Sequence, residues 1–300
     1  MAAPRHDAQG LIRTVSQRAM DMCSAAFAED RSRAAGSPRA TQSMDLPVLY
    51  RDAHLAIVDK PAGLMVHDSA LARGETDFAA DRLREQFGRP IFLVHRLDRA
   101  TSGCLLMAFD RDTASALGRM VMDSGIGTAA SEEAAFTRVF EKEYLAVCRG
   151  WPEQRFVVDH PLDGGPGKPT KRPAITEFEC LARTELAIAS QGFATSRYAL
   201  LRARPRIGCF RQIRRHLKHM SHHLIGDTSH GDGRHNRSFR MLGIHRMLLH
   251  AERLAFVHPV TGLRVCAIAP PDAQFRRALH LFDAAAVSAD KPYPGSDTRP

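Results

Sequence analysis

The order of strand-like and helix-like segments is the feature of this sequence that most restricts its fold. Apolar runs bounded by turn residues predict strands, and apolar residues spaced three to four apart predict helices. The expected strands are 48–50, 55–58, 104–109, 143–148, 174–181, 197–203, 247–257 and 263–268, and the expected helices are 78–87, 113–122, 210–220 and 272–287. Strands outnumber helices and do not alternate with them regularly, which argues against a doubly wound parallel fold. The order predicts an α+β fold, with a mixed, mainly antiparallel central sheet flanked by helices.

The length and the patterning of the chain favour one folded body. A chain of 300 residues is long enough for a large domain with a sizeable core. We expect this body over residues 47–287, and we find no internal repeat in it. Residues 1–46 are weakly patterned and are expected to form a disordered N-terminal extension, and the polar, Pro-rich residues 288–300 a flexible tail.

Several classes of protein do not fit the sequence. The longest apolar run, Cys104–Phe109, has six residues, which is far too short for a membrane helix. The opening stretch MAAPRHDAQG lacks the apolar segment of a secretory signal. The six cysteines lie far apart and form no CxxC pair, a usage typical of a reducing compartment and not of a zinc ribbon. These observations predict a cytoplasmic protein without membrane contact.

Positive charge is concentrated in one segment of the chain. The whole chain has 42 Lys and Arg against 33 Asp and Glu, a net charge of +9. Residues 197–240 contain eleven Arg and Lys but only two acids, Asp227 and Asp232. A basic segment can be an ordinary solvated face, but an excess gathered in one place favours a surface that binds a polyanion.

The densest cluster of reactive side chains precedes the expected strand at 104–109. The stretch His95-Arg-Leu-Asp-Arg-Ala-Thr-Ser-Gly103 places the carboxylate of Asp98 between the guanidinium groups of Arg96 and Arg99. Nearby cations favour an ionised carboxylate, which suits a nucleophile or a base. Spacing alone leaves a second interpretation open, in which Asp98 is a loop aspartate in ordinary surface ion pairs.

Three further patterns have both a functional and a structural interpretation. Histidines cluster between residues 216 and 235, but neither an HExxH motif nor an obvious carboxylate set accompanies them, so we expect no metal. The stretch Gly226-Asp-Thr-Ser-His-Gly231, followed by Arg234-His-Asn-Arg237, either approaches a phosphate backbone closely or forms an ordinary turn. Tyr144 lies in an apolar strand, where position alone favours a core residue with a satisfied hydroxyl.

Five motifs together resemble the RluA-type family of pseudouridine synthases. His95–Gly103 looks like the catalytic motif of that family. The other four are Val58-Asp-Lys-Pro-Ala-Gly-Leu-Met-Val-His67, Lys142-Glu-Tyr-Leu-Ala, Gln212-Ile-Arg-Arg-His-Leu with Ile225-Gly-Asp, and the C-terminal set of Leu249-His-Ala, Leu254-Ala-Phe and His258-Pro-Val-Thr-Gly262. They span about residues 50–270 in the order and spacing of the family. The resemblance implies a pseudouridine synthase fold with a basic active-site cleft.

Within the family, Ser229–Ser238 and the pair Arg214-Arg215 are similar to the branch called tRNA pseudouridine synthase C. This branch implies a uridine of the tRNA T stem, at position 65, as the target. No segment resembling an S4 RNA-binding module precedes Leu46, which also favours tRNA. A ribosomal RNA pseudouridine synthase of the same family is the alternative. Cys209 and Arg211 depart from the usual arginine and histidine of the family, a difference that concerns RNA binding and not the chemistry.

The resemblance also implies residue roles. Asp98 becomes the essential carboxylate, which attacks the base or the sugar or takes a proton from the ribose; the sequence does not choose among these. Arg214 becomes its ion-pair partner, and Tyr144 the residue that stacks on the target base. The residues expected to contact RNA are Arg96, Arg99, Arg211, Gln212, Arg215, Arg234 and Arg237. The isomerisation involves no redox change, so we expect no cofactor, and the protein is expected to be a monomer.

Overall fold

The computed structural model of the chain describes residues 45–68, 74, 76–123, 140–190 and 192–288. The first 44 residues of the expected extension, and the tail after Ser288, lie outside the described residues. Leu46, expected at the end of the extension, is only 3% exposed. Its backbone N–H donates to Gln86 Oε1 at 2.9 Å, and Gln86 Nε2 donates to its carbonyl oxygen at 2.8 Å. Leu46 is therefore part of the packed body.

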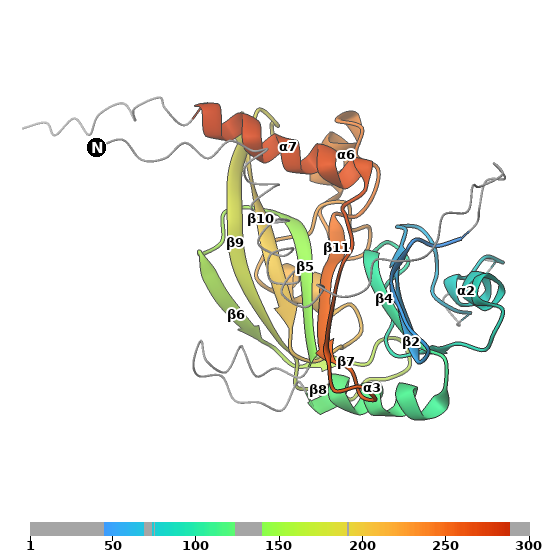
Figure 1. The fold of residues 1–300 in the computed structure, drawn as a ribbon. Coiled ribbons are helices and arrows are strands. Elements are labelled where there is room, and N and C mark those ends of the chain that lie inside the picture. Colours follow the sequence, from blue (N-terminus) through green and yellow to red (C-terminus); the bar gives the residue numbers. More distant parts are fainter. Residues whose placement is uncertain (1–44, 69–73, 75, 124–139, 191, 289–300) are drawn as a thin grey trace, which may run out of the picture.

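One large sheet forms the centre of the molecule (Figure 1). Its strands follow the order β1-β2-β4-β11-β5-β10-β9-β6, with β12 beside β11 and β3 beside β4. The strands are β1 (Val48–Arg51), β2 (Leu55–Lys60), β3 (Phe92–Leu93), β4 (Ser102–Ala108), β5 (Phe140–Arg149), β6 (Arg155–Asp159), β9 (Ile175–Leu186), β10 (Ser196–Pro205), β11 (Leu249–Val257) and β12 (Arg264–Ile268). The pair β4–β11 is parallel and the other pairs of this sheet are antiparallel. The predicted mixed, mainly antiparallel sheet is confirmed. A separate ribbon pairs β7 (Leu162–Asp163) with β8 (Lys171–Arg172).

Helices cover both faces of the sheet. They are α2 (Ala79–Phe87), α3 (Arg111–Asp123), α5 (Gln212–His219), α6 (Gly233–Met241) and α7 (Ala273–Ser288). In Figure 1, α6 and α7 lie at the top of the sheet and α3 at the bottom. None of the helices in the described part of the chain is long and apolar enough to cross a membrane.

Alternation along the strands explains why both faces are covered. Successive side chains of a strand point to opposite faces. Along β5, Leu145 and Val147 belong to the core cluster that contains residues of α6 and α7. Ala146 and Cys148 belong to the cluster that contains Ile213 of α5. Two buried faces require a strand that is apolar at nearly every position, as residues 144–148 are.

Two local expectations were wrong. The stretch from Arg234 to Arg237, which was expected to follow the Gly226–Gly231 turn without forming a helix, lies in helix α6, whose N-cap Asp232 accepts a hydrogen bond from the backbone of Arg234. The sequence pattern did not predict this helix, because Phe239 is the one apolar residue among its buried side chains and no apolar stripe marks it. Met220, expected to be the last residue of the helix 210–220, follows α5 and is 41% exposed.

Gly103, the last residue of the predicted catalytic motif, lies where β4 pairs with β11 in parallel. Its φ is +109°, and a Cβ there would lie 2.2 Å from the carbonyl oxygen of Ala251. A glycine is required at this point both by the backbone conformation and by the close approach of β11.

We expect Gly103→Ala to lower the free energy of unfolding by about 3 kcal/mol, because it adds overpacking to backbone strain. The matched control is Gly262→Ala. Gly262 also has a positive φ, +71°, but nothing lies within 4 Å of the added methyl, so the expected loss is about 1 kcal/mol. Urea unfolding of both variants measures the difference. Equal losses would show that the contact with Ala251 is relieved by a small shift.

Candidate active site

Asp98 and Arg214 meet although they lie 116 residues apart in the sequence. Asp98 is in the turn before β4, and Arg214 is in α5. Arg214 Nη1 donates to Asp98 Oδ2 at 2.6 Å. The Asp98 side chain is 26% exposed and that of Arg214 is 7% exposed. The carboxylate is therefore anchored at one oxygen while part of it remains open to solvent.

Arg214 is also held from its inner side, by Asp227. Arg214 Nε and Nη2 donate to the two carboxylate oxygens of Asp227 at 2.7 and 2.8 Å. The backbone N–H groups of Ser229 and His230 donate to Asp227 Oδ1. Burial opposes ionisation of Asp227, but the hydrogen bonds and the charge of Arg214 outweigh it and lower the pKa of the carboxyl. Burial likewise opposes the charge on Arg214, and the two aspartates outweigh it and raise the pKa of the guanidinium.

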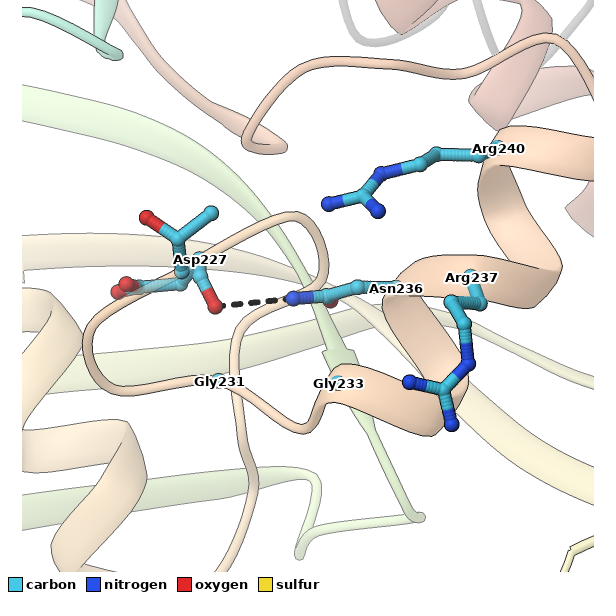
Figure 2. Close-up of a pocket in the computed structure, with 7 residues that line it drawn as sticks. Asp227, Gly231, Gly233, Asn236, Arg237 and Arg240 are labelled. Atoms are coloured by element: carbon cyan, nitrogen blue, oxygen red, sulfur yellow. Dashed lines mark hydrogen bonds between the residues drawn. The ribbon is translucent and has the colours of Figure 1, made fainter.

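The loop that carries Asp227 is fixed by Asn236 of α6. Asn236 Nδ2 donates to the carbonyl oxygen of Asp227 at 2.9 Å, the bond dashed in Figure 2. Asn236 Oδ1 accepts from the backbone of Gly226 at 2.7 Å. A Cβ on Gly226 would lie 2.1 Å from the carbonyl oxygen of Arg246. The Gly-Asp motif therefore needs its glycine for a close approach and its aspartate for Arg214.

Tyr144 of β5 packs against two core clusters on the same face of the sheet as α5. Burial raises the pKa of its phenol above the ordinary value, and the negative charge of Asp98 raises that pKa further. Tyr144 is therefore within electrostatic range of Asp98, and its hydroxyl is neutral at neutral pH. The packing confirms the core interpretation of Tyr144, and its role towards a target base stays a prediction.

Two buried lysines near the site were not identified as functional residues from the sequence. Lys60 Nζ donates to the carbonyl oxygens of Pro61, Leu64 and Arg99, and so ties the turn after β2 to the turn that holds Asp98. Burial lowers the pKa of Lys60 to about 7. Lys142 lines a small pocket with Tyr144, and burial lowers its pKa to about 8. Lys60 lies in the motif Val58–His67 and Lys142 begins the motif Lys142-Glu-Tyr-Leu-Ala. These positions were the one feature of the sequence that could have drawn attention to the two lysines.

The expected RNA contacts on the Asp98 turn are exposed. Arg96 Nη1 lies 3.2 Å from Nε2 of His67, and Arg99 Nε donates to the carbonyl oxygen of Gly63 at 3.0 Å. These two guanidinium groups therefore flank the turn that carries Asp98 and face the solvent.

The expected RNA contacts on and beside α5 have structural partners. Gln212 is buried, and its amide donates to Ile175 and Thr176 of β9 and accepts from the backbone of Cys209. Arg215 donates to the carboxylate and the carbonyl oxygen of Asp163. The Arg211 guanidinium lies 4.8 Å from the centre of the Phe210 ring. Gln212 and Arg215 thus tie α5 to β9 and to Asp163, a role that the sequence did not predict.

Much of the basic charge of residues 197–240 is neutralised by acids from other segments, which the sequence did not reveal. Arg202, Arg204 and Arg206 of the β10 region form ion pairs with acidic residues of β5 and β9, Glu143, Glu177 and Glu179. Arg197 pairs with Glu185. By contrast, the expected RNA contacts Arg234 and Arg237 are exposed on α6. The unpaired positive charge therefore occupies a smaller part of the protein surface than the basic segment 197–240 suggests.

The histidine cluster is divided among separate structural contacts. His216 Nδ1 lies 2.9 Å from Thr176 Oγ1, and His235 Nδ1 lies 2.8 Å from the hydroxyl of Tyr198. His222 and His223 lie within hydrogen-bond distance of backbone carbonyl oxygens. Within the described residues, no group of three or more His, Cys, Asp or Glu side chains is arranged to hold a metal ion.

This arrangement presents a partly exposed carboxylate, locked to a buried arginine, beside a neutral tyrosine. Such a carboxylate is positioned to attack an electrophile or to take a proton, since Arg214 fixes its geometry and two guanidinium groups flank its turn. The described side chains supply charge and position, which suits an isomerisation without net oxidation or reduction.

Comparisons with known proteins identify the family of the chain. A family model described as RNA pseudouridylate synthase matches residues 54–219. The tRNA pseudouridine synthase C of Vibrio cholerae is 42% identical over 226 residues, covering 72% of this chain and 87% of the relative. The protein of the same name from Pasteurella multocida is 36% identical over 250 residues, covering 80% and 97%.

Solved structures share the fold. Human RNA Pseudouridylate Synthase Domain Containing 4 matches with a TM-score of 0.57 at 21% identity, covering 79% of this chain and 92% of that one. Human RNA Pseudouridylate Synthase Domain Containing 1 matches with a TM-score of 0.55 at 19% identity, covering 81% and 98%. The five sequence motifs, the fold and the extent of these matches lead to one conclusion: the chain belongs to the RNA pseudouridylate synthase family, in its RluA-type group.

Proposed function

We propose that this pseudouridine synthase acts on tRNA, with Asp98 as its essential carboxylate. The observation that carries the assignment of Asp98 is its 2.6 Å ion pair with the buried Arg214. Arg214 is in turn anchored by the fully buried carboxylate of Asp227. An aspartate in an ordinary surface ion pair does not need a partner that is fixed in this way. The names of the relatives from Vibrio cholerae and Pasteurella multocida support tRNA as the substrate.

The reaction breaks the N1–C1′ bond of uridine, turns the uracil and joins it to the ribose through C5. One proton leaves C5 and one is gained at N1, so the electrons balance without an oxidant or a cofactor. The free oxygen of Asp98 is available to attack the base or the sugar, or to take a proton from the ribose. Arg214 holds the other oxygen in each case, so the carboxylate stays in place through the reaction.

Tyr144 is assigned to the target base. Its raised pKa keeps the phenol protonated at neutral pH, so stacking on uracil and donating a hydrogen bond fit it better than acting as a free base. A uridine in a helical stem must first leave its stack, at a cost of a few kcal/mol. Arg96 and Arg99, on the Asp98 turn, are assigned to hold the opened strand.

We further propose that the protein is a cytoplasmic monomer with a basic cleft around Asp98. The exposed guanidinium groups of Arg96 and Arg99 support such a cleft. RNA helices are recognised mostly through shape, phosphates and 2′-hydroxyls, because their major groove is too deep and narrow for side chains. A stem uridine would therefore be selected by backbone contacts.

Asp98→Asn is expected to abolish pseudouridine formation and to leave the fold intact. The exchange keeps the volume of the side chain and removes its charge and its nucleophilic oxygen. Pseudouridine formation on a tRNA transcript, with circular dichroism as the test of folding, measures the effect. Asp112→Asn, at an exposed position of α3, is the matched control and should retain wild-type turnover. Turnover by Asp98→Asn at the rate of that control would refute the assignment.

Asp227→Asn is expected to lower the free energy of unfolding by about 3 kcal/mol at neutral pH, because it leaves buried Arg214 with a single charged partner. The folded pKa of Asp227 is lowered, so its stabilisation is present above the ordinary carboxyl pKa and is lost as the pH falls through the folded pKa. The deficit of the variant should therefore shrink in acid. Urea unfolding at neutral and acidic pH measures it.

The same variant also tests whether Arg214 positions the catalytic carboxylate. We expect kcat of Asp227→Asn to fall by about a hundredfold, as small displacements of a reacting group do. Arg214→Lys, which keeps the charge and loses the planar fork, should show a comparable loss. Wild-type kcat in both variants would show that the arginine is merely structural.

Deletion of the gene is expected to remove pseudouridine from the T stem of tRNA, at position 65, and to leave ribosomal RNA unchanged. Mapping pseudouridine in both RNAs from the deletion strain tests this directly. Re-expression of the wild-type protein should restore the modification, and re-expression of Asp98→Asn should not. A loss confined to ribosomal RNA would support the alternative substrate instead.

A further inference from the structure

A cavity of about 280 Å³ lies between the Asp227 loop and helix α6. It is lined by Asp227, Thr228, Gly231, Gly233, Asn236, Arg237 and Arg240. Its volume is several times the roughly 30 Å³ that a water molecule occupies in the liquid. Figure 2 shows Arg240 reaching from α6 towards the Asp227 loop, and Arg237 beside Gly233. The cavity thus adjoins the segment that anchors Arg214 but does not include Asp98.

The charge of this cavity is positive. In the part of the chain that the structure describes, neither the Arg237 nor the Arg240 guanidinium forms an ion pair or a hydrogen bond with a protein group. Among the described residues that line the cavity, Asp227 alone carries a carboxylate, and Arg214 with the backbone of Ser229 and His230 already binds it. Two guanidinium groups therefore face the cavity without a counter-charge.

The hydrogen bonds of Asn236 and the close packing at Gly231 fix the shape of the cavity. Asn236 is 5% exposed and its amide bridges Gly226 and Asp227. A Cβ on Gly231 would lie 2.2 Å from the carbonyl oxygen of Asp227, so the loop closes tightly on itself. A Cβ on Gly233 would meet only Arg237 Nη1, at 3.9 Å. The loop backbone is thus fixed, while the two arginines stand at its open side.

These features select the class of ligand. A planar guanidinium fork matches the oxygens of a phosphate, and two forks with the Thr228 hydroxyl supply several donors. None of the described residues that line the cavity is aromatic, so these residues offer no platform for stacking a base. A phosphodiester of the RNA backbone meets both conditions.

We propose that Arg237 and Arg240 bind one backbone phosphate of the RNA substrate in this cavity. The proposal rests on the proposed function, because the phosphate belongs to the RNA that Asp98 modifies. Arg240 was not among the RNA contacts expected from the sequence. It lies on the same side of the chain as Arg237 only because residues 233–241 form a helix, in which residues three apart are neighbours. The bound phosphate lies against the same loop that holds Arg214, so RNA binding and the placement of Asp98 share one segment.

The test compares Arg237→Gln and Arg240→Gln with Arg119→Gln, an exposed arginine of α3 at the opposite end of the molecule in Figure 1. Each α6 variant should raise Kd for a tRNA transcript and KM by about tenfold, the effect of losing one charged contact. Each should also reduce the slope of log binding constant against log salt by about one. The value of kcat should stay within about twofold of wild type, because neither residue touches the reacting atoms. The control should change none of these quantities.

A second measurement identifies the phosphate. Methylphosphonate groups, which lack the negative oxygen, are placed one at a time in a synthetic T-arm hairpin. One of them should weaken wild-type binding about tenfold and leave binding by Arg240→Gln unchanged, since that variant has already lost the contact. Wild-type affinity and salt slope in both α6 variants would overturn the proposal.

Inorganic phosphate distinguishes a free anion from the RNA backbone. If it binds the wild-type protein and not Arg240→Gln, while both bind the hairpin equally, the cavity takes free phosphate and the proposal is wrong. Failure of the proposed function looks different: the wild-type protein would then form no pseudouridine in tRNA, whatever the α6 variants do to binding.

Discussion

The double ion pair of Arg214 is the interaction on which the site depends. A buried guanidinium is costly unless its donors are paired. Asp227, whose side chain is fully buried, takes two of those donors and makes the cation tolerable inside the protein. A third N–H group of Arg214, on Nη1, then fixes Asp98, which is partly exposed. The carboxylate of Asp98 is thus held by an arginine that Asp227 itself holds from the interior, so its position does not depend on its own turn alone.

The sheet brings the two ends of this ion pair together. The turn that carries Asp98 leads directly into β4, the strand whose parallel pairing with β11 departs from the antiparallel rule of the sheet. Gly103 permits β11 to approach at this point. Lys60 then ties the Asp98 turn to the end of β2 through the carbonyl oxygen of Arg99. The parallel pairing of β4 with β11 therefore contributes to the site as well as to the core, because it places the Asp98 turn next to α5.

The sequence predicted the parts of the fold in which apolar periodicity is strong, and it brought forward Asp98 and Arg214, which the structure places in contact; their catalytic roles stay predictions. The strand around Tyr144 is a short continuous apolar run and the helix around Ile213 is apolar on one face, so the type of each element could be recognised. Helix α6 could not, because it is stabilised by its cap at Asp232 and by Phe239 and not by an apolar stripe. The role of Asp227 was hidden for a different reason: its partner is thirteen residues away and only a fold brings them into contact.

The net charge of a segment of the sequence does not give the charge that the segment presents on the folded surface, because acids from other segments can pair with its basic side chains. The unpaired cations on the surface decide where RNA can bind. The arginines of β10 count towards the basic segment 197–240, yet the glutamates of β5 and β9 neutralise them across the sheet. Counterion release depends on cations that meet phosphates, and a paired guanidinium adds little to it. The arginines left without an acid, Arg237 and Arg240 among them, stand on a helix whose inner side holds the Asp227 loop. Under the two proposals above, the arginines that bind the RNA phosphate and the aspartate that anchors Arg214 lie on the same short segment, residues 227–240.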